Sequence, residues 1–154
     1  MPKTSVHEAL LEATGLVGDK QAHRLFHGGP ERALCLYSLE VIRALQAEGH
    51  PIYPGSAGEN LTISGLDWAQ LAPGVRLALG DEVIVELSNY TVPCKTIAAS
   101  FTGGAFERIS HKKYPGWARL YARVRQTGRL TVGQKVRVIG IRSDEGRKRD
   151  ERLG

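Results

Sequence analysis

The sequence is poor in several residue types, and each shortage excludes a class of protein. Its two cysteines, Cys35 and Cys94, are too few for a disulfide scaffold, and there is no Cys-x-x-Cys pair of the kind that structural zinc sites use. No hydrophobic run approaches the roughly 20 residues that span a bilayer, and the first residues lack the apolar stretch of a signal peptide. We therefore expect a cytoplasmic protein that does not enter a membrane.

The composition is otherwise that of an ordinary globular protein. Hydrophobic residues make up 42% of the chain and charged residues 24%, unlike the composition of a disordered chain. A length of 154 residues suits one domain with a core of its own. We expect this domain over residues 1–142 and a charged, flexible tail over residues 143–154, where Leu153 is the only large apolar residue.

Charge is distributed unevenly along the chain. The formal net charge is +5, but residues 1–90 contain 6 basic and 11 acidic residues, whereas residues 91–154 contain 15 basic and 5 acidic residues. A strongly basic half favours anionic partners such as a phosphate, a nucleotide or nucleic acid.

Short segments separated by turns indicate a mainly β fold. Eighteen glycines and seven prolines punctuate the chain and predict many turns, including a loop over residues 51–58. Ser38 is the expected N-cap of a helix over residues 39–48, and a second helix is expected to begin at Lys95. Apolar or alternating runs predict strands over residues 33–37, 61–63, 75–79, 82–87 and 117–125.

Cys94 is the candidate for thiol chemistry. It follows Pro93 at the expected start of a helix, and Lys95 is its neighbour. Backbone N–H groups and an ammonium group favour the thiolate, which binds soft metals, attacks sulfur and carries a persulfide. The alternative is a buried cysteine that packs as a small hydrophobic side chain. We adopt that alternative for Cys35, which lies within an apolar run.

Two histidines and a glycine-rich segment precede this cysteine. His23 and His27 have the spacing of two metal ligands on one helix face, but Gly28 and Gly29 interrupt a helix. A proton donor or an anion contact is therefore the preferred role of His27 over a zinc ligand. Residues 55–60 either let backbone N–H groups approach an anionic ligand or form a tight connection and nothing more.

Basic side chains recur near the C-terminal end of the predicted domain. They line either a phosphate-binding mouth or a solvated positive surface, and strand alternation predicts that the first three do not all share one face. The group comprises Arg119, Arg123, Arg125, Arg129, Lys135 and Arg137.

A set of short motifs, taken in order, resembles the MOSC domain, the module named for the C-terminal part of molybdenum cofactor sulfurase. The set covers about residues 5–140 and comprises residues 15–19 (GLVGD), 27–33 (HGGPERA), 55–61 (GSAGENL), 79–81 (LGD), 93–94 (PC) and 132–136 (VGQKV). The resemblance implies a mainly β fold, with a single closed β-barrel and a few short peripheral helices. It also implies one functional cysteine, which matches Cys94.

The resemblance implies two functions. Some relatives bind molybdenum cofactor (molybdopterin), with this cysteine ligating the metal, and reduce N-hydroxylated compounds. Others carry sulfur as a cysteine persulfide for the assembly of metal–sulfur cofactors. Larger cofactor-binding relatives often have an arginine just before the Pro-Cys pair, where this sequence has Tyr90-Thr91-Val92, and arginines of the C-terminal strands are candidates to replace it. Pyridoxal phosphate is not expected, because no transferase domain accompanies the matched region.

Our leading hypothesis is an oxidoreductase that uses molybdenum cofactor and receives electrons from a reductase partner. In this hypothesis glycine-rich loops and basic groups hold the pterin phosphate, and His27 or Asn60 delivers a proton or orients a small-molecule substrate. One alternative is a persulfide carrier served by a cysteine desulfurase. Another is a small basic barrel that binds nucleic acid, against which the aromatic content of 6% argues. The expected site residues are Cys94, His27 and Asn60 as catalytic groups, Gly28, Gly29, Gly58, Glu59, Asn60, Asn89, Lys95 and Arg123 as cofactor-binding groups, and Cys94 as the metal ligand.

Overall fold

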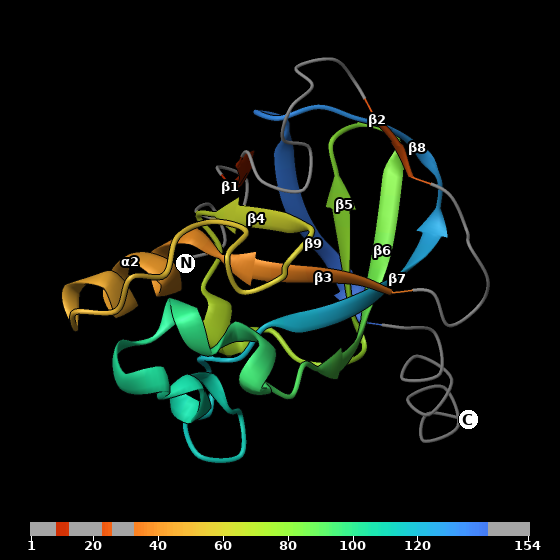
Figure 1. Ribbon diagram of the computed structural model, residues 1–154. Helices are drawn as coiled ribbons and strands as arrows, with labels where there is room; N and C mark the ends of the chain where they lie inside the picture. The colour runs from red at the N-terminus through yellow and green to blue at the C-terminus, as the bar shows by residue number, and fades with distance from the viewer. Residues whose placement is uncertain (1–8, 13–22, 26–32, 142–154) are drawn as a thin grey trace, which may run out of the picture.

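β-Strands dominate the computed structural model, which describes residues 9–12, 23–25 and 33–141 (Figure 1). The strands are β1 (Ala9–Glu12), β2 (His23–Leu25), β3 (Ala33–Ser38), β4 (Leu61–Ser64), β5 (Val75–Leu79), β6 (Val83–Tyr90), β7 (Leu120–Gln126), β8 (Gly128–Leu130) and β9 (Lys135–Ile141). The helical segments are α2 (Leu39–Ala47) and the 3-10 turns η1 (Trp68–Gln70), η2 (Lys95–Ser100), η3 (Thr102–Gly104) and η4 (Phe106–Ile109). The predicted mainly β class with a few short helices is confirmed for these residues.

One curled sheet contains most of the strands. Its order runs β4-β3-β7-β6-β5-β9, and neighbours are antiparallel except for the parallel pair β3–β4. β1 pairs with both edge strands, but it meets β9 only at Ala9–Val136 and Leu10–Lys135. Because β1 has four residues, the ring of pairing closes through one short seam. The expected closed barrel is therefore corrected to a curled half-barrel sheet with its edges bridged by β1.

The period-two pattern predicted the central hairpin well. β5 and β6 pair in the register Leu77–Val85 and Leu79–Val83, and these four side chains are buried. The expected strand over residues 117–125 instead begins at Leu120. The two backbone carbonyls at residues 117 and 118 bond to side chains and not to a neighbouring strand. The hydroxyl of Tyr37 donates to the carbonyl of Trp117, and the indole N–H of Trp68 donates to the carbonyl of Ala118.

The predicted helix over residues 39–48 is confirmed as α2. Ser38 is its N-cap, and Oγ of Ser38 accepts a hydrogen bond of 3.1 Å from the backbone N–H of Val41. The helix buries Leu39, Ile42 and Leu45 against the core. The helix expected from Lys95 is a 3-10 turn, η2.

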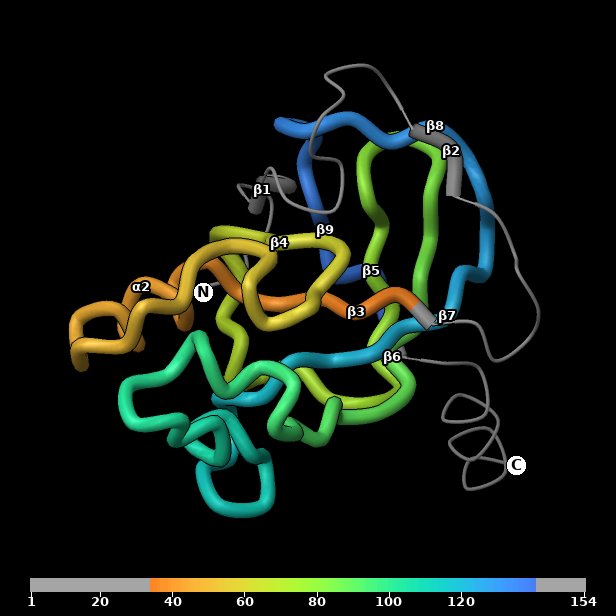
Figure 2. Tube along the Cα trace, viewed as in Figure 1, coloured from red at the N-terminus to blue at the C-terminus, as the bar shows by residue number. Residues whose placement is uncertain are grey.

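The long connection between β6 and β7, residues 91–119, lies on the same side of the sheet as α2 (Figure 2). The guanidinium group of Arg108 joins the carboxylate of Glu48 at 3.0 and 2.7 Å, and Oγ1 of Thr102 donates to the carbonyl of Gly49 at 2.7 Å. These contacts tie the connection to the end of α2, and Cys94 lies near its start. The predicted tail, residues 143–154, lies outside the described residues.

Candidate functional site

Cys94 lies on an exposed turn at the end of β6. The backbone is extended at Cys94 and then enters η2, for which this residue is the N-cap. Pro93 is buried, whereas the thiol of Cys94 is fully accessible to solvent. The prediction that this residue stands at a helix start is thus confirmed, with a six-residue 3-10 helix in place of an α-helix.

Hydrogen bonding from Thr96 favours the thiolate form of Cys94. Oγ1 of Thr96 lies 2.9 Å from Sγ of Cys94. Hydrogen bonds from the side chain and the backbone of Thr96 lower the pKa of Cys94 below its ordinary value, and the positive charge of Arg119 lowers it further. The predicted contribution of backbone N–H groups is thus confirmed at Thr96, whereas the cation that lowers the pKa of Cys94 is Arg119 and not the predicted Lys95.

Arg119 is the buried cation of the site. Its side chain is only 6% exposed, and Nη1 donates a hydrogen bond of 2.6 Å to the carbonyl oxygen of Ala57. Its Nε atom is buried and has no protein partner. An unpartnered buried N–H is costly, and this atom is shielded from solvent on a side chain that also interacts with the buried thiol of Cys35.

The glycine-rich loop, residues 55–60, packs against η2. Oγ of Ser100 donates to the carbonyl oxygen of Ser56 at 3.1 Å and contacts its hydroxyl at 2.9 Å. Gly58 adopts φ +86°, a left-handed conformation that favours glycine, and a Cβ there would lie 3.8 Å from Nη1 of Arg119. The loop, Arg119 and the turn that carries Cys94 are therefore connected in space.

Glu59 and Asn60 hold this loop in place. The buried carboxylate of Glu59 accepts from the backbone of Gly55 at 2.7 Å and from the hydroxyl of Thr62 at 3.1 Å, while its other oxygen, Oε1, has no protein partner. The side-chain oxygen of Asn60 accepts from the backbone N–H of Cys35 at 2.7 Å, and the backbone of Asn60 donates to the carbonyl of Cys35. Among the predicted residues, Asn60 thus fixes loop geometry with its amide oxygen.

The remaining predicted residues are spread along the fold. Lys95 is exposed next to Cys94, and Asn89 is exposed on β6 beside a register shift in its pairing with β7. Arg123 lies on β7 opposite Glu86, on the face away from the buried side chains of Ala122 and Val124. It is therefore not brought to Cys94 by any described contact. His27, Gly28 and Gly29 lie outside the described residues.

Cys35 has the structural role predicted for it. It is 5% exposed, and burial raises the pKa of its thiol despite the nearby positive charge of Arg119. Its sulfur lies 3.7 Å from the hydroxyl of Thr91. A buried neutral thiol of this kind is inert compared with Cys94.

Sequence reasoning did not single out Thr96 and Ser100, and it placed Arg119 on a strand with other basic residues. A hydroxyl two residues after a cysteine is a weak sequence signal, because the local turn determines whether the hydroxyl reaches the sulfur. Arg119 precedes β7, so strand alternation does not describe the direction of its side chain. The described residues contain no group of three or more His, Cys, Asp or Glu side chains placed to hold a metal ion.

Comparisons with known proteins agree with this fold. A family model of the MOSC domain matches residues 23–137. The chain is 29% identical over 147 residues to YflK of Bacillus subtilis (strain 168), a match covering 95% of this chain and 65% of YflK. It is 31% identical over 132 residues to a protein named Reductase from Gibberella moniliformis (strain M3125 / FGSC 7600), covering 82% of this chain and 23% of that protein.

The fold also resembles a solved structure. The crystal structure of YiiM from Geobacillus stearothermophilus matches with a TM-score of 0.65 at 24% identity, covering 79% of this chain and 62% of that one. The chain thus spans less than two thirds of the length of these relatives. Of the described helices, none combines the length and hydrophobicity needed to span a bilayer. Since the family model covers most of the sequence and the fold agrees with it, the chain belongs to the MOSC domain family.

Proposed function

We propose that this protein binds molybdenum cofactor through Cys94 and reduces N-hydroxylated compounds. The observation that carries the proposal is an exposed thiol whose pKa is lowered by Thr96 and by the buried cation Arg119. A thiolate is a soft ligand of the kind that such a metal centre requires. A relative named Reductase supports the choice of reaction class.

The residues present fit the cofactor. Cys94 would ligate the metal, and the loop at Gly58, together with the nearby charge of Arg119, would favour the anionic phosphate of the pterin. When bound, the cofactor supplies the two electrons that cleave an N–O bond, so that a hydroxylamine, two protons and two electrons from a reductase partner give an amine and water.

The chain's own residues prepare the site for this role. The hydroxyl of Thr96 hydrogen-bonds to the sulfur of Cys94. The Ser56–Ser100 contact fixes the glycine-rich loop relative to η2. The amide of Asn60 keeps the loop in register with β3 through Cys35. We assign Asn60 to this positioning role and not to proton transfer.

The test is metal content and activity of protein made in a host that synthesises the cofactor. We expect bound molybdenum and reduction of 6-hydroxylaminopurine with reduced methyl viologen as the electron donor. Cys94→Ser should lose both, whereas Cys35→Ala, which removes the buried thiol, should keep both. Metal-free wild-type protein, or a Cys94→Ser variant with full activity, would overturn the proposal.

A second function, persulfide transfer, is favoured by the accessibility of Cys94. The thiol is exposed at the surface and lines neither the hollows beside Trp68 nor the one beside Arg108, so a protein partner has direct access to it. In this reaction the Cys94 thiolate attacks the outer sulfur of a desulfurase persulfide. A new S–S bond forms on Cys94, the old S–S bond breaks, and the desulfurase cysteine leaves as a thiolate, with no net oxidation.

Mass spectrometry distinguishes this reaction from metal binding. After incubation of the metal-free protein with a cysteine desulfurase and free cysteine, the carrier function predicts the added mass of one sulfur atom on Cys94. Cys94→Ser should carry no adduct, and Cys35→Ala should carry the full adduct. An unmodified Cys94 beside a demonstrably active desulfurase would contradict the carrier function.

A further inference from the structure

A groove beside Trp68 is lined by none of the residues assigned to the Cys94 site and has no part in the proposed function. It consists of two hollows of about 310 Å³ and about 270 Å³, which share Trp68, Ala69, Pro115 and Gly116. We call these hollows together the Trp groove. Small-molecule sites begin at about 300 Å³, so the larger hollow has room for a small ligand.

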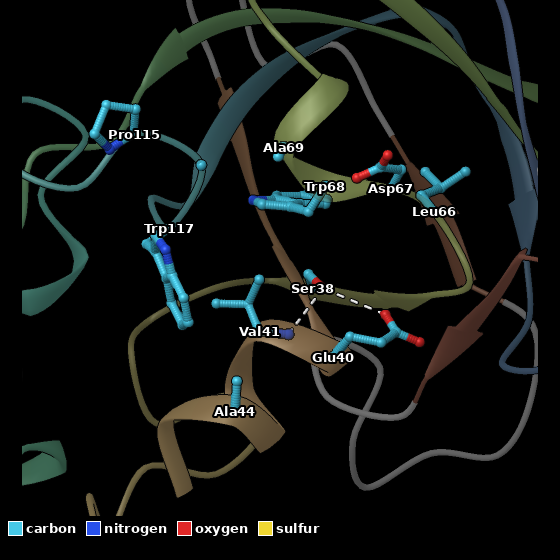
Figure 3. A pocket seen from close by; sticks show the side chains of 11 residues that line it. Ser38, Glu40, Val41, Ala44, Leu66, Asp67, Trp68, Ala69, Pro115 and Trp117 are labelled. Atoms are coloured by element: carbon cyan, nitrogen blue, oxygen red, sulfur yellow. Dashed lines mark hydrogen bonds between the residues drawn. The ribbon is translucent and has the colours of Figure 1, made fainter. Parts of the chain in front are cut away.

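Two indole rings form walls of the larger hollow, and both are held in place. Figure 3 shows Trp117 on one side and Trp68 between Trp117 and Asp67, and Trp68 is itself only 5% exposed. The indole N–H of Trp68 donates to the carbonyl of Ala118 at 2.8 Å, and the guanidinium carbon of Arg108 lies 4.0 Å from the ring centroid of Trp117. Rings fixed before binding cost little conformational entropy when a ligand arrives.

The opposite side of the hollow is acidic. Figure 3 places the carboxylates of Glu40 and Asp67 across from Trp117. Glu40 accepts from the backbone of Gly65 at 3.0 Å, and Asp67 is exposed and makes no hydrogen bond as a cap of η1. No lysine or arginine is among the described residues that line either hollow, although the chain carries a net charge of +5.

We propose that the Trp groove binds a small organic cation, an ammonium group carried on an aromatic or aliphatic body. Aromatic faces attract a cation within about 6 Å of the ring centroid, and tryptophan does so most strongly. The body of the ligand packs against Trp68 and Ala69, and its charge faces Glu40 and Asp67. An anionic ligand is disfavoured in the larger hollow, because both of its charged lining side chains are carboxylates, while the smaller hollow adds His111.

The chain provides its own reporter for this site. It contains two tryptophans, Trp68 and Trp117, and both line the Trp groove, so all tryptophan fluorescence originates there. We would titrate the full chain with benzyltrimethylammonium and, in parallel, with neutral benzyl alcohol and anionic benzenesulfonate. The expected result is a saturable fluorescence change with the cation at concentrations where the other two compounds give none.

Two variants locate the binding and one serves as the control. Asp67→Asn should weaken the cation about threefold, the size of an exposed charge contact. Ala69→Leu, which adds a larger side chain to the wall shared by both hollows, should abolish the saturable change. Asp81→Asn makes the same chemical change at an exposed turn outside the groove and should leave affinity unchanged.

Three outcomes would overturn the proposal. These are the absence of a saturable change with the cation, an equal response to benzyl alcohol, and the same affinity in Ala69→Leu as in the wild type. A thermal unfolding curve for each variant establishes that the fold is intact before the affinities are compared.

Discussion

Nη1 of Arg119 donates a hydrogen bond of 2.6 Å to the carbonyl oxygen of Ala57, so that one buried cation anchors the glycine-rich loop. The same positive charge lowers the pKa of Cys94. Arg119 therefore contributes both to loop geometry and to thiol ionisation, although it precedes β7 and lies far from both partners in the sequence. This double contribution makes Arg119 the most informative residue to change.

Replacing Arg119 by methionine should affect both properties. The change removes the charge and leaves the carbonyl of Ala57 without its donor, at a cost of about 1–3 kcal/mol in the free energy of unfolding. The pKa of Cys94 should rise, because one of its stabilising charges is lost. Chemical denaturation measures the first effect, and the pH dependence of iodoacetamide alkylation at Cys94 measures the second. Arg119→Lys, which keeps the charge, should restore the lowered pKa of Cys94 more than the free energy of unfolding.

Replacing Thr96 by valine should raise the pKa of Cys94 without a large loss of stability. The exposed hydroxyl of Thr96 is the main cause of the lowered pKa, so its removal shifts the alkylation profile toward higher pH. Alkylation at neutral pH should slow accordingly, as followed by mass spectrometry of the Cys94 peptide. Thr127→Val, at another exposed threonine, is the matched control. An unchanged profile in Thr96→Val would show that the hydroxyl does not stabilise the thiolate.

Replacing Ser100 by alanine should loosen the glycine-rich loop from η2. The buried hydroxyl bonds to both the carbonyl and the side chain of Ser56, and its loss should cost about 1 kcal/mol. A double-mutant cycle with Ser56→Ala separates the side-chain contact from the carbonyl contact. Fully additive losses would mean that the two hydroxyl groups do not interact.

Strands β3 to β7 and helix α2 were predictable because their causes are local. The alternation of buried side chains along β6 and the Ser38 N-cap of α2 are each determined by residues that are adjacent in the sequence. The start of β7 was not, since Tyr37 and Trp68 occupy the carbonyls of residues 117 and 118 from distant parts of the chain. The sequence also led us to expect a fully closed barrel. It does not reveal that β1 is too short to pair with β9 at more than two residue pairs.

The helix-start position of Cys94 was predictable from the sequence, but its neighbours in space were not. Cys94 was selected because it follows Pro93 at an expected helix start and matches the cysteine of the resembled family. The pairing of Arg119 with Ala57 spans 62 residues, and no local pattern encodes it. The amide of Asn60 was predicted to serve chemistry, yet it bonds the backbone of Cys35, a contact fixed only when β3 and the loop meet.

Replacing Glu48 by glutamine should reduce stability in a pH-dependent way. Hydrogen bonds from Arg108 lower the pKa of Glu48 below its ordinary value, so the stabilising contribution is complete above about pH 4.3, the ordinary pKa, and is lost as the pH falls through the lowered value. Because the Glu48 carboxylate is exposed to solvent, although Arg108 is mostly covered, the difference from wild type at neutral pH should not exceed about 1 kcal/mol. Urea denaturation between neutral pH and pH 3 measures it. Since surface ion pairs are screened by salt, about 1 M NaCl should shrink the difference in stability between the variant and the wild type. A loss of stability that does not depend on pH would instead point to the packing of Arg108 on Trp117 as the affected interaction.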